Sequence, residues 1–242
     1  MPETEPMPLP APTRDLRQAR ADLDRHGLCQ IPEVLSRDTC AKARQILYAA
    51  AAQDRTSPQQ APDFPLDVDA NNQRVWNLLA RDPLFSALAE HSTALELVRH
   101  LLGWPALLSN ISANIAYPNT AAGVMHADQG FVAQPWPARP QGLNVAWCVD
   151  DFSAANGATL VAPAGSILVF ESRLWHQSGA NTTTDESRAG VFAFYTTPAY
   201  RTQENWFLTL DEAFLRTASP TLLTLLAYKA QGFGLVYGRS PR

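Results

Sequence analysis

The chain has 242 residues, of which 46% are apolar and 17% are charged, and its formal net charge is -4. This length and apolar content support one sizeable core, and β-barrels of this length commonly form one domain. The slight acidity, without clustered Lys and Arg, argues against a nucleic-acid partner, and no apolar run approaches the roughly 20 residues that a membrane span requires.

The N-terminal segment is acidic and rich in proline and lacks the basic and apolar regions of a signal peptide. We therefore expect a disordered leader over residues 1–14 and a single domain over 15–242. The three cysteines are scattered and include no C-x-x-C pair. They predict buried thiols in a cytoplasmic protein, without disulfides and without a structural zinc site.

Two helices and a strand are predicted at the start of this domain. The segment Leu16–His26 carries apolar residues at helical spacing, and Gly27 is expected to end the helix. The short run Leu28–Ile31, which precedes a proline, favours a strand. Ser36 is a candidate N-cap for an alanine-rich helix over residues 37–53.

The following segment is expected to change from loop to helix. Residues 54–72 contain three prolines and many polar residues, which predicts a surface loop. Helical periodicity returns over 74–102, with a break near Asp82 and Pro83. Gly103 is expected to end it, so that the N-terminal helices occupy about residues 15–103.

After this point the pattern becomes one of short β-rich runs separated by Pro, Gly, Asn and Asp. Regular short strands with such punctuation are typical of a sandwich or barrel. The runs cover residues 107–117, 142–149, 158–161, 166–171 and 189–196, and a last helix is expected over 220–229. We therefore predict a mainly β domain with flanking helices and a β core over about residues 104–206.

A possible metal site follows from three residues of this β core. His126 and Asp128 stand two positions apart, and residues at this spacing in an extended segment point to the same face. His176 follows the run at 166–171. Two imidazoles and one carboxylate that leave three positions open are typical of iron(II) oxygenases. The pair alone is weak evidence, because a surface His beside a turn Asp also arises by chance.

An arginine and a serine that follow His176 are candidates for binding a carboxylate beside the metal. Ser178 stands two positions after His176, and Arg188 begins the next β-like run. An arginine inside a barrel can bind the distal carboxylate of 2-oxoglutarate through two parallel hydrogen bonds, and it keeps its charge. Taken alone, Arg188 is better explained as a solvent-facing residue of a polar turn. Together with the three candidate metal ligands, it favours a 2-oxoglutarate site.

The sequence from about residue 20 to 206 resembles the phytanoyl-CoA dioxygenase family. The resemblance is carried by HADQG at 126–130, NVAWCVDDF at 144–152, NGAT at 156–159, PAGSILVFESRLWHQSGANTT at 163–183, Arg188, YTTP at 195–198 and QENW at 203–206. It implies a double-stranded β-helix (a jelly-roll, cupin-like barrel) that uses Fe(II), 2-oxoglutarate and O2. His126, Asp128 and His176 match the family's iron ligands, Arg188 matches its carboxylate-binding arginine, and Ser178 matches the hydroxyl partner.

The resemblance also implies a reaction class. Related halogenases have a small residue in place of the metal-binding carboxylate, so the presence of Asp128 favours hydroxylation or another oxidation. The expected substrate is a small, partly apolar metabolite, oxidised with release of succinate and CO2. Neither a nucleic acid nor a membrane is expected as a partner.

One departure from the family leaves alternatives open. The segment at 156–161 runs directly into the segment at 162–170, so that a stretch which family members have near the mouth of the active site is missing. A barrel that binds metal and 2-oxoglutarate without efficient turnover is therefore the second hypothesis. A cupin-like enzyme that uses another metal and ignores 2-oxoglutarate is the third.

Further residues are candidates for contacts with the cofactors or the substrate. Asn144 and Trp147 stand three positions apart in one predicted strand, so at most one of them should face the pocket. Packing within the barrel is the alternative for both. Gln129 directly follows Asp128 and is a candidate for a hydrogen bond to the metal ligands. Trp136 is a candidate wall of the substrate pocket, with a plain exposed loop residue as the alternative.

Overall fold

The computed structural model describes residues 8–56, 69, 71–230, 232 and 234–242. The helices are α1 Leu16–His26, α2 Arg37–Thr56, α3 Pro83–Ala89, α4 Ser92–Leu102, α5 Trp206–Thr209, α6 Glu212–Thr217 and α7 Pro220–Leu225, with short 3-10 turns at Leu78–Ala80 and Asp128–Phe131. The strands are β1 Leu28–Ile31, β2 Asn72–Val75, β3 Leu107–Ala116, β4 Gly142–Cys148, β5 Ile167–Glu171 and β6 Arg188–Thr196. Part of the expected leader lies outside the described residues, and 8–14 form neither helix nor strand.

The first elements begin and end where the sequence predicts. Gly27 takes the left-handed conformation, with φ of 73°, and ends α1. The Ser36 hydroxyl accepts a hydrogen bond from the N–H of Thr39 at 3.1 Å and caps α2. The predictions for α1, β1 and the start of α2 are confirmed, and α2 runs to Thr56.

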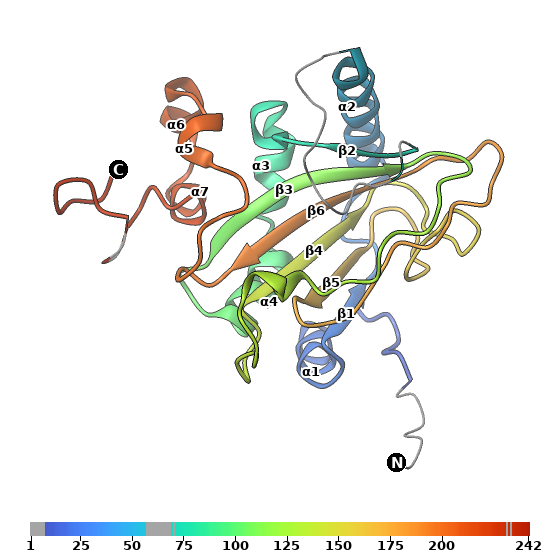
Figure 1. Ribbon diagram of the computed structural model, residues 1–242, viewed down its shortest axis with the longest axis horizontal. Coiled ribbons are helices and arrows are strands. Elements are labelled where there is room, and N and C mark those ends of the chain that lie inside the picture. The colour runs from blue at the N-terminus through green and yellow to red at the C-terminus, as the bar shows by residue number, and fades with distance from the viewer. Residues whose placement is uncertain (1–7, 57–68, 70, 231, 233) are drawn as a thin grey trace.

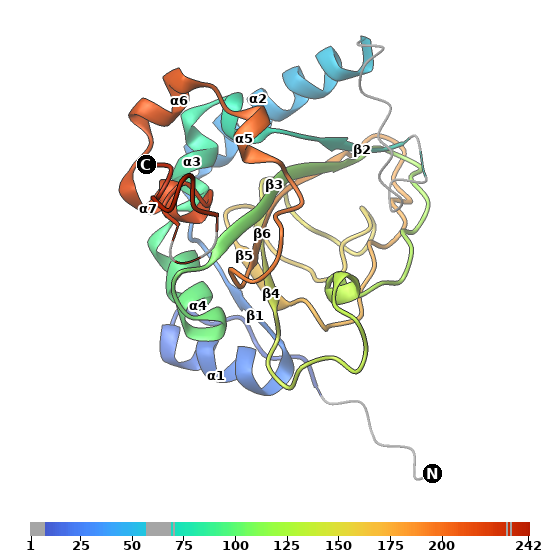
Figure 2. The ribbon, with the colours of Figure 1, turned by 60° about the vertical axis from the view of Figure 1, so that its left-hand side comes forward.

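Six antiparallel strands form one sheet in the order β1-β5-β4-β6-β3-β2 (Figure 1). Side chains alternate between the two faces of a strand. One face is apolar and packs against the helices, which gather on that side (Figure 2). Its residues include Ile111, Ala113, Ile115, Leu143, Val145, Trp147, Ile167, Val191, Ala193 and Tyr195. The helices therefore bury one face and leave the other face for a site.

The second face is opposed by loops that stand where a jelly roll has its second sheet. Within the described chain, this second layer is reduced to isolated antiparallel bridges, which join His126 to His176, Phe152 to Ala162 and Asn156 to Asn181. The result is a jelly-roll barrel with flanking helices, as predicted. The bridges hold the loops in place without a continuous ladder of backbone hydrogen bonds.

Three predictions about secondary structure are wrong. Residues 72–75 form the edge strand β2, because Asn72 to Val75 pair with Ala116 to Ala113 of β3. The helical segment after it breaks a second time at His91, whose Nδ1 accepts the N–H of Thr93 and caps α4. Residues 158–161 form no strand, since the chain turns at Gly157, where φ is 80°, and only Ala162 pairs with Phe152.

The C-terminal region contains more helix than the sequence indicates. The short helices α5 and α6 were not predicted, and α7 ends at Leu225, before the expected end at 229. Leu222 and Leu225 are buried in the core that the helices share with the sheet. The three cysteines are buried and unpaired, as expected. No helix in the described part of the chain is long and apolar enough to cross a membrane.

The fully buried Tyr195 ties the sheet to a helix. Its hydroxyl donates to the carbonyl of Ala89, at the end of α3, at 2.7 Å. Replacing Tyr195 with phenylalanine leaves that carbonyl without its partner, and we expect a loss of about 1–2 kcal/mol in the free energy of unfolding. Urea denaturation measures the change. Replacing the fully exposed Tyr237 with phenylalanine is the control and should leave the midpoint unchanged.

Candidate metal centre and active site

Two histidines are placed side by side by a single backbone bridge. The N–H of His126 donates to the carbonyl of His176 at 3.0 Å, and the N–H of His176 donates back at 2.9 Å. Residues paired in this way present their side chains on the same face. The ring centroids lie 4.4 Å apart. The bridge thus brings together two residues that are far apart in the sequence.

Each of these rings has its orientation set by a backbone carbonyl. The Nδ1 of His126 lies 2.8 Å from the carbonyl of Val124, and the Nδ1 of His176 lies 3.0 Å from the carbonyl of Leu174. When Nδ1 carries the proton and donates to such a carbonyl, Nε2 is left as the electron-pair donor. Both imidazoles are therefore arranged to offer Nε2 to a metal ion.

The carboxylate of Asp128 completes the group. One of its oxygens lies 3.5 Å from Nε2 of His126, and the other lies 3.6 Å from Nε2 of His176. One ligand atom from each of the three residues lies within 4.8 Å of the others. The hydrogen-bonding carboxylate raises the pKa of His126, although burial works against the rise. The three side chains form a compact set of two nitrogen donors and one oxygen donor.

Asn144 holds this carboxylate from the sheet. Its side-chain N–H donates to Oδ2 of Asp128 at 2.6 Å. It extends from β4 on the face opposite the helices, where it pairs with Phe194 of β6. The expectation that Asn144 and Trp147 face opposite sides is confirmed. Asn144 contacts the candidate metal ligand, which makes it a positioning residue.

Trp147 and Gln129 do not reach the cavity, and their assignment as cofactor contacts is corrected. Trp147 is fully buried on the helix side, where its ring meets that of His91 edge to face with centroids 5.2 Å apart. Gln129 is also fully buried. Its Oε1 accepts from the N–H of Gln141 at 2.8 Å and from the hydroxyl of Ser172 at 2.9 Å. It anchors a loop instead of bonding to the metal ligands.

A cavity of about 570 Å³ lies between the free face of the sheet and the loops, and the three candidate ligands line it. Its aromatic walls are Phe131, Phe152, Phe170, Phe192 and Phe194, and its polar lining includes Asn110, Ser112, Asn114, Asn144, Ser178, Arg188, Arg201 and Gln203. Trp136 is not among the lining residues, since its indole N–H bonds back to the carbonyl of Val132. Phe131, from the same loop, forms the wall instead.

Arg188 lies deep in this cavity with only 4% of its surface exposed. Its guanidinium donates to the carbonyl of Gly157 and lies over the ring of Phe152, 5.0 Å from the centroid. Burial lowers its pKa, but an arginine stays charged at neutral pH. The carboxylate of Asp150 is near enough to counteract this shift, but it forms its ion pair with Arg44, and no carboxylate among the described residues forms an ion pair with Arg188. A buried cation of this kind calls for an anionic ligand.

Ser178 lines the same cavity, and its position is fixed through its backbone. Its carbonyl accepts a hydrogen bond from the N–H of Gly123 at 2.8 Å. The segment 157–165 borders this part of the cavity, and Thr159 donates to the carbonyl of Gln177 at 2.6 Å. This segment then enters β5 through a turn closed by the N–H of Ser166 and the carbonyl of Pro163. The direct connection expected from the sequence is therefore a short, hydrogen-bonded loop.

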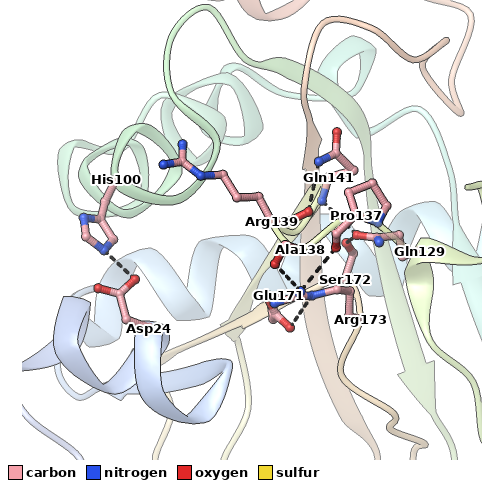
Figure 3. Close-up of polar contacts among 10 residues, drawn as sticks. All are labelled: Asp24, His100, Gln129, Pro137, Ala138, Arg139, Gln141, Glu171, Ser172 and Arg173. Atoms are coloured by element: carbon pink, nitrogen blue, oxygen red, sulfur yellow. Dashed lines mark hydrogen bonds and ion pairs between the residues drawn. The ribbon is translucent and has the colours of Figure 1, made fainter. Parts of the chain in front are cut away.

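The loop that follows Asp128 is pinned to the end of β5 by one arginine (Figure 3). The Arg173 guanidinium donates to both carboxylate oxygens of Glu171, at 2.9 and 2.7 Å. Its remaining terminal nitrogen donates to the carbonyl of Ala138 at 2.5 Å, while Gln129 and Ser172 hold the end of the loop at Gln141. This arrangement fixes the loop that carries Phe131 over the cavity.

Replacing Arg173 with methionine keeps much of the side-chain length but removes these hydrogen bonds. Glu171, whose side chain is only 12% exposed, would then lack its cation. We expect residues 132–140 to become roughly ten times more sensitive to limited proteolysis, as a lost charged hydrogen bond is worth about 1.5–3 kcal/mol. Arg139 points away from this cluster (Figure 3), so replacing it with methionine is the matched control. Equal cleavage of both variants would contradict the assignment.

Comparison with known proteins links this geometry to a family. The sequence model of the phytanoyl-CoA dioxygenase family (PhyH) matches residues 23–164 and 160–190. The two matched segments meet at 160–164, where the sequence indicates a missing stretch. The dioxygenase af480 of Aspergillus fumigatus is 35% identical over 247 aligned positions, which cover 91% of this chain and 80% of that protein.

Solved structures share the fold at lower sequence identity. HygX from Streptomyces hygroscopicus, solved with nickel and 2-oxoglutarate, has a TM-score of 0.59 and 14% identity, over 79% of this chain and 90% of that one. The non-haem α-ketoglutarate-dependent epimerase SnoN of nogalamycin biosynthesis has a TM-score of 0.60 and 20% identity, over 80% of this chain and 86% of that one. At these identities the likeness establishes the jelly-roll fold.

Proposed function

The chain belongs to the phytanoyl-CoA dioxygenase family, and from this premise we propose that it is a non-haem iron(II) dioxygenase that uses 2-oxoglutarate to oxidise a small, partly apolar metabolite. One observation carries the proposal. A set of two imidazoles and one carboxylate lines the same cavity as a buried arginine that has no carboxylate partner among the described residues. The first group suits iron(II), and the second suits a dicarboxylic acid.

The donor set fits the metal. His126, Asp128 and His176 would hold iron(II) through Nε2, a carboxylate oxygen and Nε2, which leaves open positions for 2-oxoglutarate and O2. The carbonyls of Val124 and Leu174 orient the two rings, and Asn144 orients the carboxylate. Iron bound in this way supplies the activation of O2, coupled to the decarboxylation of 2-oxoglutarate to succinate and CO2.

Arg188 would bind 2-oxoglutarate, and the aromatic walls of the cavity would shield it from water. The Arg188 fork would bind the distal carboxylate of 2-oxoglutarate in two parallel hydrogen bonds, with the Ser178 hydroxyl beside it. Phe152, beneath the guanidinium, and Phe170, whose ring centroid lies 4.8 Å from that of His176, keep water away from the bound acid. A dry environment strengthens each of these charged contacts.

The cavity favours a substrate of moderate size with an apolar body. Five phenylalanines line it, and Asp128 is the only carboxylate among the described lining residues. HygX has been solved with hygromycin B bound, and SnoN with nogalamycin RO, so relatives with this fold accept small natural products. This chain is proposed to act on a small molecule as well.

The test is an oxidation assay with iron(II), 2-oxoglutarate and O2, in which succinate is quantified across a panel of apolar small molecules. The expected result is a slow basal release of succinate that at least one compound accelerates. Iron and 2-oxoglutarate that bind without any release of succinate would support the second hypothesis, a barrel that binds both without efficient turnover. The exposure of Val161, which is 65% in the short segment 157–165, favours that alternative.

Asn144 is expected to tune the affinity for iron. Replacing it with leucine removes the hydrogen bond to Asp128 while keeping the side-chain volume similar. Because a residue that orients a metal ligand typically contributes 10- to 100-fold in affinity, we expect the dissociation constant for iron(II) to rise by about 30-fold. Anaerobic competition with a chromogenic chelator measures it. Replacing Asn205, which is not among the cavity-lining residues, with leucine should leave the constant unchanged.

A further inference from the structure

The cavity has two polar regions. Arg188 stands at one end of β6, and Phe194 lies six residues further along the strand, about 20 Å away. Phe194 pairs on one side with Asn144, which bonds to Asp128, and on the other side with Asn110 of β3. The region around Asn110 is therefore level with the candidate metal ligands along the strands, displaced across the sheet toward β3, and far from the proposed 2-oxoglutarate end.

The region beside β3 contains a cluster of uncharged polar side chains. The Asn110 amide donates to the hydroxyl of Ser112 at 3.2 Å and to Oε1 of Gln203 at 3.0 Å. Its Oδ1 is buried without a hydrogen-bond partner, as is the hydroxyl of Thr196. The side-chain N–H groups of Gln203 make no hydrogen bond to the part of the chain that the structure describes, although its backbone N–H donates to the hydroxyl of Ser109. The cluster can therefore both donate and accept further hydrogen bonds.

An apolar wall surrounds this cluster. Phe131 reaches over the cavity from the pinned loop, with its ring 6.1 Å from that of Phe194 and 5.0 Å from that of Tyr200. Phe194 itself pairs with Asn110 across β6 and β3. The wall beside the cluster therefore suits a hydrocarbon body.

The charges in this half of the cavity do not favour an ionised substrate. Arg201 is exposed, and an exposed ion pair contributes at most about 1 kcal/mol. The Arg74 guanidinium donates to Ser112 and lies over the ring of Trp76. Leaving a buried amide oxygen without a donor costs about 1–3 kcal/mol, so hydrogen bonding within the cluster outweighs the charge at the mouth.

Resting on the function proposed above, we propose that the substrate is an uncharged alcohol with an apolar body, and that Asn110 and Gln203 bind its hydroxyl group. A hydroxyl group both donates and accepts, so it can satisfy the Oδ1 of Asn110 and an N–H of Gln203 together. A carboxylate only accepts, and an ammonium only donates. The two amides are thus specificity-determining residues on the substrate side of the metal.

The test compares three probes that differ only in their polar head: n-octanol, octanoate and octylamine. Calorimetric titration is carried out on the protein with iron(II) and 2-oxoglutarate under anaerobic conditions, and again on the protein alone. Octanol should bind at least about tenfold more tightly than the other two, as expected for one buried hydrogen bond and a desolvated charge. The titration of the protein alone separates this result from a failure of the proposed cofactors to bind.

Variants locate the interaction. Asn110→Leu and Gln203→Met should each weaken the binding of octanol about tenfold. Asn110 lies within β3 and bonds to both Ser112 and Gln203, whereas Gln203 lies in a connecting segment and its side chain bonds to Asn110 alone among the described residues. Gln203→Met is therefore the variant with less effect on folding. Gln45→Met, at an exposed position of α2 that does not line this cavity, is the matched control. Tighter binding of octanoate that is lost in Arg201→Gln would overturn the proposal in favour of an anionic substrate, and octanol affinity unchanged in both amide variants would also overturn it.

Discussion

Replacing Asp128 with alanine is expected to lower the iron-dependent release of succinate by more than about 100-fold. Residues that merely orient a metal ligand contribute 10- to 100-fold, so the loss of a charged ligand should exceed that range. Asp128 is also the only carboxylate among the described residues that line the cavity, so no neighbour there can take its place. Succinate is quantified at saturating 2-oxoglutarate, and bound iron is measured in parallel.

The matched control for this substitution is Asp185→Ala. Asp185 is an exposed carboxylate in the loop that leads to β6, and it does not line the cavity. The control variant should retain the wild-type rate. Wild-type release of succinate by Asp128→Ala would contradict the assignment of the metal ligands, and loss of activity in both variants would point to a general defect in folding.

Replacing Arg188 with alanine is expected to raise the dissociation constant for 2-oxoglutarate by roughly 30- to 1000-fold. Removing one partner of a buried, hydrogen-bonded charge pair costs about 2–4 kcal/mol, which corresponds to that range. Arg188 is 4% exposed and has no carboxylate partner among the described residues, so its charge is available to the ligand. Anaerobic calorimetry in the presence of iron(II) measures the constant.

A second variant separates the charge of Arg188 from the geometry of its guanidinium group, and a third serves as the control. Arg188→Lys keeps the positive charge but loses the planar fork, so its affinity should lie between those of the wild type and the alanine variant. Arg139→Ala removes an exposed arginine that does not line the cavity and should leave the affinity unchanged. Affinity for 2-oxoglutarate that does not change in Arg188→Ala would remove the main support for this co-substrate.

Local signals account for the parts of the fold that the sequence predicts well. The helix α1 and the start of α2 are marked by Gly27 and Ser36, residues whose backbone or side-chain chemistry ends or begins a helix. The strands β3 to β6 were predicted because their residues form short β-rich runs that are separated by Pro, Gly, Asn and Asp. By contrast, β2 contains three polar residues in four, and only its pairing with β3 makes it a strand.

At 158–161 the error is the reverse of that at β2, because a strand was predicted where the structure has none. Its composition favours a strand, but Gly157 turns the chain and Thr159 bonds through its side chain to Gln177. These contacts depend on the neighbouring loop that carries His176, which lies beyond the range of a local pattern. The sequence did show that the connection before β5 is short. The family's motifs on both sides of it, at 156–159 and 163–183, could be recognised without the stretch that normally lies between them.

The residues of the candidate site also fall into two groups, those that a local sequence pattern predicts and those that it does not. His126, Asp128, His176 and Arg188 could be proposed from residue type and spacing, and the structure brings them to one cavity. Alternation along β4 also predicted that Asn144 and Trp147 face opposite sides, but not which of them faces inward. The role of Gln129 was missed because its partners, Gln141 and Ser172, are distant in sequence.

The polar cluster around Asn110 was not predicted, and the one substrate contact that was predicted, Trp136, does not line the cavity. Asn110, Ser112 and Asn114 alternate along β3, and this pattern of polar residues in a buried strand was an available signal. Gln203 joins them only through the packing of the segment after β6, where its backbone N–H donates to the hydroxyl of Ser109 at 2.9 Å. Such a contact requires the register of β3 against β6, which no local sequence pattern provides.

The most direct test of the central claim is an anaerobic titration of the protein with iron(II) and 2-oxoglutarate, followed by visible absorption. We expect a charge-transfer band that requires both components and that is strongly weakened in Arg188→Ala at the same concentrations. A protein that binds iron but gives no band with 2-oxoglutarate would contradict the use of this co-substrate and favour a cupin-like enzyme of different metal chemistry.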